Sequence, residues 1–339
     1  MKVLLTGAQG FLGGRVLDFL LEKDYQVRAI VRRPAPELAA RGVELVQADL
    51  CDAAKVEEAA QGRDGIIHCA ARSGIWGPLA EYLKANLVST LNILAAARRA
   101  GVGWLVHTSS PSVIHTGAPL DGVDESAPYT QDARQGYPYS KMLAERAVLS
   151  ADGPDFRTVA LRPHLIWGPG DPHFLPRMLE RAKAGSLWLL ETKALVDGVF
   201  IDNAARAHLL AAEKLQAGEG RLIGGRAIFV AQGEPLTAAA LIQKILTAVS
   251  EPGHPLRIKG LIPARLGRRA GWLMEALWKI LPLSGEPPLT RFVVEELTLP
   301  HWFKLDRLKN DLGFTEPVST EEGLRIMRDW AESRDYLLL

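Results

Sequence analysis

A lysine and two tyrosines in the segment GYPYSK, residues 136–141, have the types and the spacing to do proton chemistry. An isolated tyrosine has a pKa of about 10, but a tyrosine held near a lysine can donate and accept a proton closer to neutral pH. In a helix that begins near Pro138, residues four apart share a face and residues two apart do not. This spacing predicts that Tyr137 pairs with Lys141, and that Tyr139 packs or lines a pocket.

Serine hydroxyls at the end of an apolar run offer a third polar group. Ser109 and Ser110 close the strand-like segment WLVHTSS, and a hydroxyl there can hold the oxygen of a substrate. A chance Tyr-x-x-x-Lys on a helix surface is the alternative for the tyrosine and lysine alone. The three residue types together favour proton transfer to or from a substrate oxygen.

Glycines follow the first strand-like segment in the run TGAQGFLGG. Gly7, Gly10 and Gly13 lie between an apolar run and a helical pattern. Glycine lets the backbone approach a pyrophosphate there, and the start of the helix supplies N–H groups. A glycine-rich turn without a ligand is the alternative, but the strand–turn–helix context predicts a dinucleotide site. An oxidised nicotinamide near Tyr137 would help to stabilise its anion.

Two arginines stand where a carboxylate would select NAD. Arg32 and Arg33 follow the second strand-like segment, and a guanidinium suits a 2′-phosphate through its planar donors. NADP(H) is therefore the preferred cofactor and NAD(H) the second choice, with two solvated surface arginines as the alternative. Asp49, after the third strand-like segment, is placed for the adenine edge or for capping the next helix.

Composition narrows the class of protein. Of 339 residues, 47% are hydrophobic and 23% charged, and the net charge of +1 gives no reason to expect a nucleic-acid partner. Cys51 and Cys69 fit neither a disulfide framework nor a metal site, so we expect no metal. No apolar run reaches the length of a membrane span, and the chain begins with the strand-like MKVLLTG, which predicts a cytoplasmic protein.

Apolar runs alternate with helical patterns through the first half of the chain, which predicts class α/β with a Rossmann-type doubly wound parallel sheet. We expect residues 1–169 to form a dinucleotide-binding domain to which 196–216 returns. Residues 170–339 should form a smaller, mostly helical substrate domain. The expected strands are Val3–Thr6, Val27–Val31, Glu44–Gln47, Gly65–His68, Trp104–Thr108 and Thr158–Arg162. The expected helices are Leu12–Lys23, Ala54–Ala60, Pro78–Ala100 and Pro138–Ser150.

The order TGAQGFLG, HTSSPSV, YPYSK and LRPHLIWGPGD resembles the extended short-chain dehydrogenase/reductases of the epimerase/dehydratase superfamily over nearly the whole chain. The resemblance implies a catalytic serine, tyrosine and lysine. It favours Ser110 over Ser109, because PSV follows at the family's spacing. Asn86 matches an asparagine near the family's active site, with a structural role as the alternative. Implied cofactor contacts are Phe11, Leu12, Leu50, Ala70, Ala71, Pro163 and His164, beside Lys141. Members often dimerise through helices matching 78–100 and 138–150.

Four segments, AARSGIWG, TSSPSVIH, LRPHLIWGPGD and GEPPLTRF, are most similar to the 3β-hydroxysteroid dehydrogenase branch, and there to bacterial reductases of 2-alkyl-3-oxoalkanoates in olefin biosynthesis. This implies NADPH-dependent reduction of a β-keto acid with two long alkyl chains. The alternatives are oxidation of a 3β-hydroxysteroid or a sterol 4-carboxylate, a nucleotide-sugar epimerase or dehydratase, and a non-catalytic dinucleotide sensor. Arg32 and Arg33 argue against the NAD-dependent sugar enzymes, and the presence of Tyr137 and Lys141 argues against the sensor.

Residues 262–281 bear on whether the substrate is hydrophobic. Four basic residues accompany one acid in this segment, which is typical of a helix at a membrane interface. Membrane-surface contact or a wall for acyl chains is one interpretation, and an ordinary helix packed on the core is the other. Trp76 and His164 are candidate substrate contacts near the expected site. The apolar face of the helix consists of Leu266, Ala270, Leu273, Leu277 and Leu281, widened by Met274 and Trp278.

Overall fold

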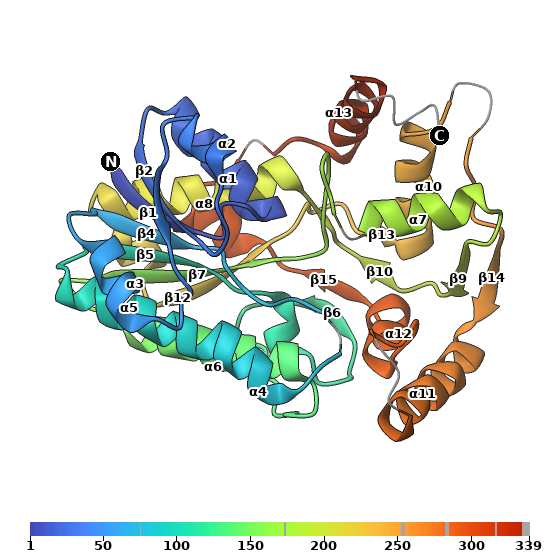
Figure 1. The fold of residues 1–339 in the computed structure, drawn as a ribbon. Coiled ribbons are helices and arrows are strands. Elements are labelled where there is room, and N and C mark those ends of the chain that lie inside the picture. Colours follow the sequence, from blue (N-terminus) through green and yellow to red (C-terminus); the bar gives the residue numbers. More distant parts are fainter. Residues whose placement is uncertain (75, 173, 252–254, 282–284, 316, 334–339) are drawn as a thin grey trace.

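The computed structural model describes residues 1–74, 76–172, 174–251, 255–281, 285–315 and 317–333. A parallel sheet with helices on both faces occupies one side of the molecule, and helices with short strands occupy the other (Figure 1). The α/β class and the Rossmann-type sheet predicted from the sequence are confirmed.

Among the described residues, seven strands form the large sheet in the order β12-β7-β5-β4-β1-β2-β3, and every neighbouring pair is parallel. Their central residues are mostly buried Val, Leu and Ile, because a sheet covered on both faces needs apolar side chains on both. The strands are β1 (Lys2–Thr6), β2 (Gln26–Val31), β3 (Glu44–Gln47), β4 (Gly65–His68), β5 (Trp104–Thr108), β7 (Arg157–Pro163) and β12 (Arg226–Val230).

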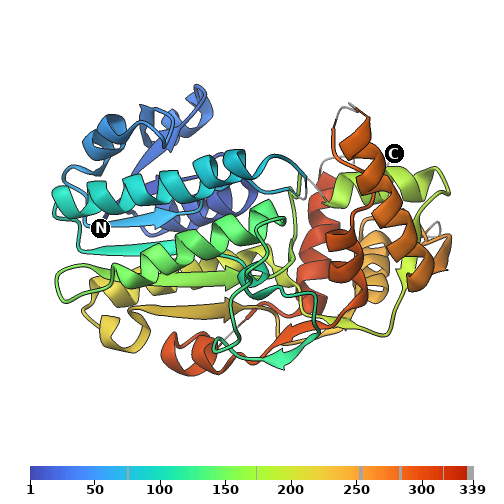
Figure 2. The same ribbon diagram turned by 90° about the horizontal axis from the view of Figure 1, so that it is seen from below.

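Helices α1 and α8 cover one face of this sheet, and α3, α5 and α6 cover the other (Figures 1 and 2). The helix expected over 78–100 consists of α4, a π-helical segment Leu83–Val88 and α5 in direct succession. The bounds are α1 (Phe11–Glu22), α2 (Pro36–Ala39), α3 (Ala53–Ala60), α4 (Leu79–Tyr82), α5 (Ser89–Arg99), α6 (Gly136–Ser150), α8 (Ile201–Gln216) and α9 (Gly220–Ile223).

The strand order reverses between β1 and β4, which lie side by side in the sheet. Ligands of open α/β sheets bind in the crevice outside the carboxyl ends of the strands at such a point. Gly7 opens the loop after β1 with φ +78°, and a Cβ there would lie 2.8 Å from the backbone nitrogen of Ala70, after β4. Glycine is needed because the two loops meet with no room for a side chain.

The second half of the chain adds one strand to this sheet and one helix that packs on it. Helix α8 lies within the expected return of 196–216 and packs on α1, β4, β5 and β7. Strand β12 pairs with β7 from Arg226↔Val159 to Val230↔Pro163 and was not anticipated. Its apolar run of four residues is too short to distinguish a strand from buried helix by periodicity.

The remaining elements form the other side of the molecule. The small sheet β13-β10-β15-β6 joins a strand that follows β5 to a strand near the end of the chain. Their bounds are β6 (Leu120–Val123), β8 (Ile166–Trp167), α7 (Phe174–Lys183), β9 (Trp188–Glu191), β10 (Leu195–Val196), β11 (Val199–Phe200), β13 (Leu236–Thr237), α10 (Ala238–Ala248), β14 (Gly260–Pro263), α11 (Ala264–Ile280), α12 (Arg291–Thr298), β15 (His301–Phe303) and α13 (Thr320–Ser333). Short 3₁₀ and π-helical segments span Pro111–Ile114 and Arg307–Asp311.

Helix α11 packs through its small residues rather than its large ones. A Cβ on Gly267 would lie 2.5 Å from Leu190, and one on Gly271 would lie 3.1 Å from the backbone of Thr290. The helix therefore lies close to β9 and to the start of α12, and its leucine face stays exposed, which differs from the interpretation as an ordinary core helix. The exposed apolar residues are Leu266, Trp272, Leu273, Leu277, Ile280 and, just beyond, Leu281. Within the described part of the chain, every helix is too short or too polar to cross a membrane.

Candidate active site

The glycine loop between β1 and α1 has the shape of a pyrophosphate site. Gly10 is the N-cap of α1 and no side chain caps it, so the first N–H groups of the helix remain available at the loop. A Cβ on Gly13 would clash with the carbonyl oxygen of Gly7. Phe11 and Leu12 begin the helix beside this cradle. The residues present therefore fit a dinucleotide, because space that side chains would fill is left to the backbone and a ligand.

Arg32 and Arg33 are exposed just beyond the end of β2, and among the described residues neither forms an ion pair. Asp49 follows β3, and its Oδ1 accepts the N–H of Cys51 at 2.8 Å. This hydrogen bond, with a smaller effect from Arg32, holds the pKa of the Asp49 carboxyl below its usual value. The cap of α3 is Asp52, so the alternative that Asp49 caps the next helix is wrong.

The loops after β3 and β4 place further predicted cofactor residues at the same sheet edge. The N–H of Ala70 donates to Oγ1 of Thr6 at 3.1 Å, which ties the loop after β4 to the end of β1. Ala71 follows and is exposed. The carbonyl of Leu50 accepts a hydrogen bond of 2.9 Å from Asn92 of α5. Ala70 and Ala71 therefore lie beside the glycine loop where the strand order reverses, and Leu50 follows the edge strand β3 at the same end of the sheet.

Tyr137, Ser110 and Lys141 gather where β5 ends and α6 begins. Tyr137 lies in the first turn of α6, and its hydroxyl forms a hydrogen bond with the Ser110 side chain. Lys141 is buried one turn later, and its Nζ donates to the carbonyl oxygen of Thr108 at 2.5 Å. The helix begins at Gly136, so the tyrosine and the lysine share a helical face as their spacing predicts.

Ser110 rather than Ser109 contacts the tyrosine. Ser110 is extended, and its Oγ also lies 3.0 Å from Oγ of Ser112. The Oγ of Ser109 is buried and has no hydrogen-bond partner. Successive side chains of an extended segment point to opposite sides, which separates the two serines. Tyr139 packs against the hydrophobic core, as expected from its position two residues before the lysine.

Burial sets the proton affinities of the pair. It raises the pKa of Tyr137 above its usual value, and the hydrogen bond with Ser110 opposes this shift. Burial also lowers the pKa of Lys141 to about 8, although the Glu145 carboxylate favours the ammonium. At pH 7 Lys141 is mostly protonated and Tyr137 keeps its hydroxyl proton. This is the state that a general acid requires.

A buried ion pair fixes α6 on the sheet. Nη2 and Nε of Arg162, in β7, donate to the two carboxylate oxygens of Glu145 at 2.6 and 3.0 Å. The Tyr129 hydroxyl donates to the same carboxylate at 2.7 Å. Glu145 follows Lys141 by one turn, so the pair holds the face that carries both catalytic candidates. No motif in the sequence specified this pair, because Arg162 and Glu145 meet only through the packing of α6 on β7.

Asn86 lies in the π-helical segment and connects two parts of the site. Its Oδ1 accepts the N–H of Arg72 at 2.7 Å, and its Nδ2 donates to the Arg72 carbonyl at 3.1 Å. Nδ2 also donates to Oγ of Ser140 at 2.9 Å, and that hydroxyl donates to the carbonyl of Tyr137 at 2.9 Å. Asn86 therefore holds the loop after β4 against the start of α6. These contacts fit the structural role better than a contact with substrate.

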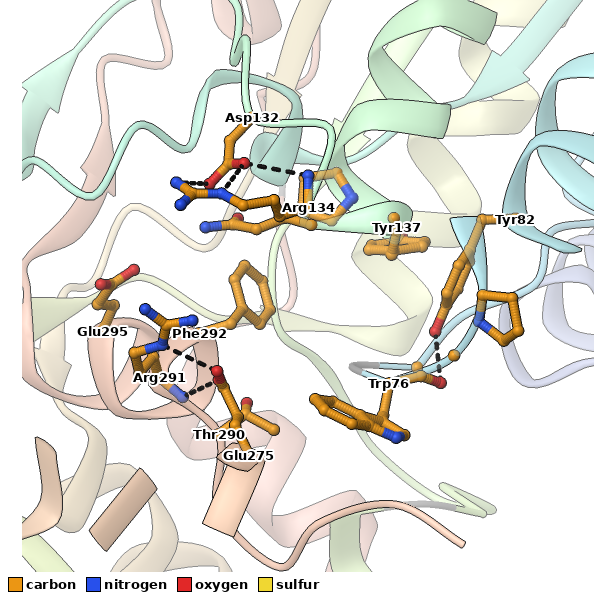
Figure 3. A pocket seen from close by; sticks show the side chains of 16 residues that line it. Trp76, Tyr82, Asp132, Arg134, Tyr137, Glu275, Thr290, Arg291, Phe292 and Glu295 are labelled. Carbon is orange, nitrogen blue, oxygen red and sulfur yellow. Dashed lines mark hydrogen bonds and ion pairs between the residues drawn. The ribbon is translucent and has the colours of Figure 1, made fainter. Parts of the chain in front are cut away.

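A pocket of about 450 Å³ opens beside Tyr137 (Figure 3). Its volume lies in the range of small-molecule sites. One wall comes from the loop after β4, where the Tyr82 hydroxyl donates to the carbonyl of Trp76 at 3.0 Å. The opposite wall comes from α11 and α12, which the sequence analysis did not connect with Tyr137. The side chains facing one another across the pocket are Trp76, Tyr82, Tyr137 and Phe292, with the ion pairs Asp132–Arg134 and Glu275–Arg291 at its rim.

His164 is not among the residues that line this pocket. It is buried after β7, where its Nδ1 lies 3.0 Å from the carbonyl oxygen of Asp197 and its ring stands edge-on to Phe303. Pro163, the last residue of β7, is buried as well. The structure thus places Trp76 beside Tyr137 and sets His164 apart from both.

The chain is similar to known proteins in both sequence and structure. A family model described as "3-beta hydroxysteroid dehydrogenase/isomerase family" matches residues 4–256. The chain is 42% identical over 331 residues to the 2-alkyl-3-oxoalkanoate reductase of Stenotrophomonas maltophilia (strain K279a), covering 97% of this chain and 98% of the relative. It is 32% identical over 335 residues to the 3 beta-hydroxysteroid dehydrogenase/Delta 5-->4-isomerase of Mycobacterium tuberculosis (strain CDC 1551 / Oshkosh), covering 95% and 88%. The solved structure of MoeE5 in complex with UDP-glucose and NAD shares the fold, with a TM-score of 0.72 at 22% identity over 98% of this chain and 99% of that chain.

Proposed function

Because this chain belongs to the 3-beta hydroxysteroid dehydrogenase/isomerase family, we propose that it reduces a bulky hydrophobic 2-alkyl-3-oxoalkanoate to the 3-hydroxy acid with NADPH. The resemblance read from its motifs is confirmed, and the chain is an NAD(P)-dependent oxidoreductase of the extended short-chain dehydrogenase/reductase superfamily. The observation that carries the proposal is that Tyr137, Ser110 and Lys141 gather where β5 ends and α6 begins, with Tyr137 lining the pocket.

Tyr137 moves the proton in this proposal. Its hydroxyl donates to the substrate oxygen as negative charge develops there, and Ser110 stabilises that oxygen by a hydrogen bond. The Lys141 ammonium lowers the free energy of the phenolate that remains. Nζ of Lys141 has three N–H donors, of which the Thr108 carbonyl takes one and Nε2 of His107, 3.4 Å away, can take a second, so one donor remains for the cofactor ribose. The bound nicotinamide dinucleotide supplies the hydride.

The preference for NADPH rests on Arg32 and Arg33, two exposed guanidinium groups at the end of β2 that have no acidic partner among the described residues. A 2′-phosphate would pair with them, whereas the ribose 2′-hydroxyl of NADH would leave them unpaired. Replacing both by serine should lower the ratio of kcat/KM for NADPH to kcat/KM for NADH by about tenfold or more. Arg41→Ser, an exposed arginine that already pairs with Asp18, is the control and should leave the ratio unchanged.

The pocket supports a substrate with a charged head and apolar chains. Arg134 and Arg291 are cationic groups at its rim, and Trp76 and Phe292 give it aromatic walls. Alkyl chains longer than the pocket would have to continue beyond it. Helix α11, which contributes Glu275 to the rim, carries exposed leucines along its outer face. We place the ends of the chains toward that face.

Helix α11 also supports peripheral contact of a cytoplasmic enzyme with a membrane surface. Its exposed leucines are accompanied by exposed Arg265, Arg268 and Arg269, which suit anionic headgroups. The protein should cosediment with vesicles that contain an anionic phospholipid and less with neutral ones. The double variant Leu273→Ser, Leu277→Ser should lose this binding and keep its melting temperature. Equal sedimentation of the variant and the parent would contradict the contact.

A homodimer through α5 and α6 is part of the proposal. The two helices pack against each other, and Val88 and Leu91 are exposed apolar residues on the segment that leads into and begins α5. A mass of twice the chain in light scattering, reduced toward one chain by Leu91→Glu, supports this surface.

The test is the oxidation of NADPH or NADH, followed by absorbance, with 2-alkyl-3-oxo acids as substrates. The reverse direction uses 3-hydroxy acids, 3β-hydroxysteroids and UDP-sugars with NADP or NAD. Turnover of the 3-oxo acids with NADPH is the expected result. Preferred turnover of a steroid would favour the second candidate, 3β-hydroxysteroid oxidation, which the similarity to the mycobacterial relative supports. Turnover of a UDP-sugar alone would overturn both.

A further inference from the structure

A cluster of three side chains lies next to the pocket wall but outside the proposed proton chemistry. His115 follows the 3₁₀ segment Pro111–Ile114, Glu296 belongs to α12, and His301 begins β15. Figure 1 shows α12 and β15 on the side of the molecule away from the helices of the large sheet. We propose that His115, Glu296 and His301 bind one divalent transition-metal ion, and that Zn²⁺ suits this set of two imidazoles and one carboxylate.

The distances between the candidate ligand atoms fit one central ion. Oε1 of Glu296 lies 3.2 Å from Nδ1 of His115 and 3.7 Å from Nε2 of His301, and one ligand atom of each residue lies within 4.8 Å of the others. Tetrahedral Zn²⁺ with bonds of about 2.0–2.2 Å holds its ligand atoms about 3.3 Å apart. Small side-chain movements bring the three atoms to that separation.

Among the described residues, three of the four ring nitrogens of the two histidines have no hydrogen-bond partner. Both ring nitrogens of His301 are buried without a hydrogen-bond partner, and the residue is 2% exposed. Nδ1 of His115 is also without one, because the nearby Glu296 oxygen lies outside hydrogen-bond geometry. Unpaired buried polar atoms cost free energy. Three groups that are close together but not bonded to one another are the arrangement of ligands around a common centre.

A second carboxylate orients one of the ligands. Nε2 of His115 donates to Oε2 of Glu295 at 3.0 Å, which puts the ring proton on Nε2 and leaves the lone pair of Nδ1 toward Glu296. Metal-binding histidines usually donate their other N–H to a carboxylate or a carbonyl in this way. Glu295 therefore supports the site without binding the ion.

The charges of the cluster also favour a cation. Among the described residues, the ion pairs of Glu295 and Glu296 are with His115 and His301, and none is with lysine or arginine. With neutral histidines the two neighbouring carboxylates carry a charge of −2, which one divalent ion balances. Glu296 keeps part of its side chain exposed, which gives the ion a path to enter.

Metal at this site would join α12 and β15 to the segment after β5. Phe292 of α12 stands edge-on to His115 and lines the pocket, so the ion would hold a wall of the substrate site in place. The sequence predicts no metal because its two cysteines fit no metal site, and His115 lies 181 and 186 residues before the other two ligands, too far for a ligand-spacing motif. The site does not depend on the proposed reaction.

The test measures metal in the whole protein after removal of any affinity tag. Elemental analysis should find about one equivalent of zinc per chain, and the protein stripped with a chelator should take up about one equivalent of Co²⁺ with the strong visible bands of a tetrahedral site. Trace metal together with a Co²⁺ spectrum equal to that of the free ion would overturn the proposal, whether or not the enzyme is active.

Substitutions of the proposed ligands test where the ion binds. Glu296→Gln and His301→Asn should abolish the Co²⁺ bands, and Glu295→Gln should weaken Co²⁺ binding by about 10- to 100-fold. Glu57→Gln removes a partly exposed glutamate that pairs with Arg99 and is the control that should bind as the parent does. Retention of full Co²⁺ binding by both Glu296→Gln and His301→Asn would overturn the assigned site. If one of these variants does not fold, the other and the parent protein still decide.

Discussion

Two arginine–glutamate pairs support different parts of the site and differ in how they are surrounded. Arg162 and Glu145, which fix α6 beneath the catalytic candidates, have side chains 1% and 0% exposed. Arg291 and Glu275, which join α12 to α11 at the pocket rim, have side chains 50% and 12% exposed. The catalytic side is fixed by interactions without access to water, whereas the substrate side is held by contacts that water or a substrate can replace.

The difference assigns separate tasks to the two regions. Proton transfer requires Tyr137, Ser110 and Lys141 to stay at fixed positions, and a rigid support provides this. A wall that admits bulky chains benefits from replaceable contacts and from the close but shallow packing of α11 through Gly267 and Gly271. The two regions should therefore respond differently to matched substitutions.

Glu145→Gln should have the largest effect on stability. It leaves the Arg162 guanidinium buried without a countercharge, which costs about 3–5 kcal/mol of unfolding free energy. The matched change Glu275→Gln removes a partly exposed pair and should cost about 0–1 kcal/mol. The measurement is urea unfolding of both variants beside the parent. Equal losses would remove the contrast between the two sides of the pocket.

Truncating one leucine in each region should give a slightly smaller difference in the free energy of unfolding. Leu20 of α1 is fully buried, and Leu20→Ala should cost about 2–5 kcal/mol. Leu273 of α11 is 53% exposed, and Leu273→Ala should change the unfolding free energy by about 0.5 kcal/mol or less. Thermal melts of the two variants give the comparison. A large loss with Leu273→Ala would mean that the α11 face is covered within the protein.

The pH dependence of reduction gives a third, smaller contrast. Burial lowers the pKa of Lys141 to about 8, so the ammonium is present below that pH and is lost above it. We expect kcat/KM for reduction to be flat below pH 8 and to fall by up to about tenfold per pH unit above it.

Lys141→Met is the control for that profile. It should lower the rate and remove the fall near pH 8. A parent enzyme whose rate stays constant through this range would mean that the ammonium of Lys141 is not required for proton transfer.

Local sequence patterns predicted most of the elements on the catalytic side of the molecule. The strands Gly65–His68 and Trp104–Thr108 have the bounds expected from their apolar runs, because parallel strands buried on both faces are continuous in sequence. The partly exposed edge strand Glu44–Gln47 also has its expected bounds. The pairing of Tyr137 with Lys141 follows from helical spacing alone, and Gly7 from the turn that the chain must make after β1.

The sequence did not show which residues far apart in the chain come into contact. The leucine face of α11 can be read from a helical wheel, but the wheel does not say that glycines on another side make the packing contact. Strand β12 and the pocket wall of α12 depend on where the chain returns in space. The Arg162–Glu145 pair depends on the register of α6 on β7, which no local pattern specifies.

The proposed reaction depends most directly on which tyrosine transfers the proton. The measurement is NADPH-dependent reduction of a 2-alkyl-3-oxo acid by the parent, Tyr137→Phe and Tyr139→Phe, with NADPH binding followed by fluorescence. Tyr137→Phe should bind NADPH and lose about 10²–10⁴-fold in kcat, while Tyr139→Phe stays within a few-fold of the parent. Full activity of Tyr137→Phe, above all together with loss of activity in Tyr139→Phe, would contradict the account.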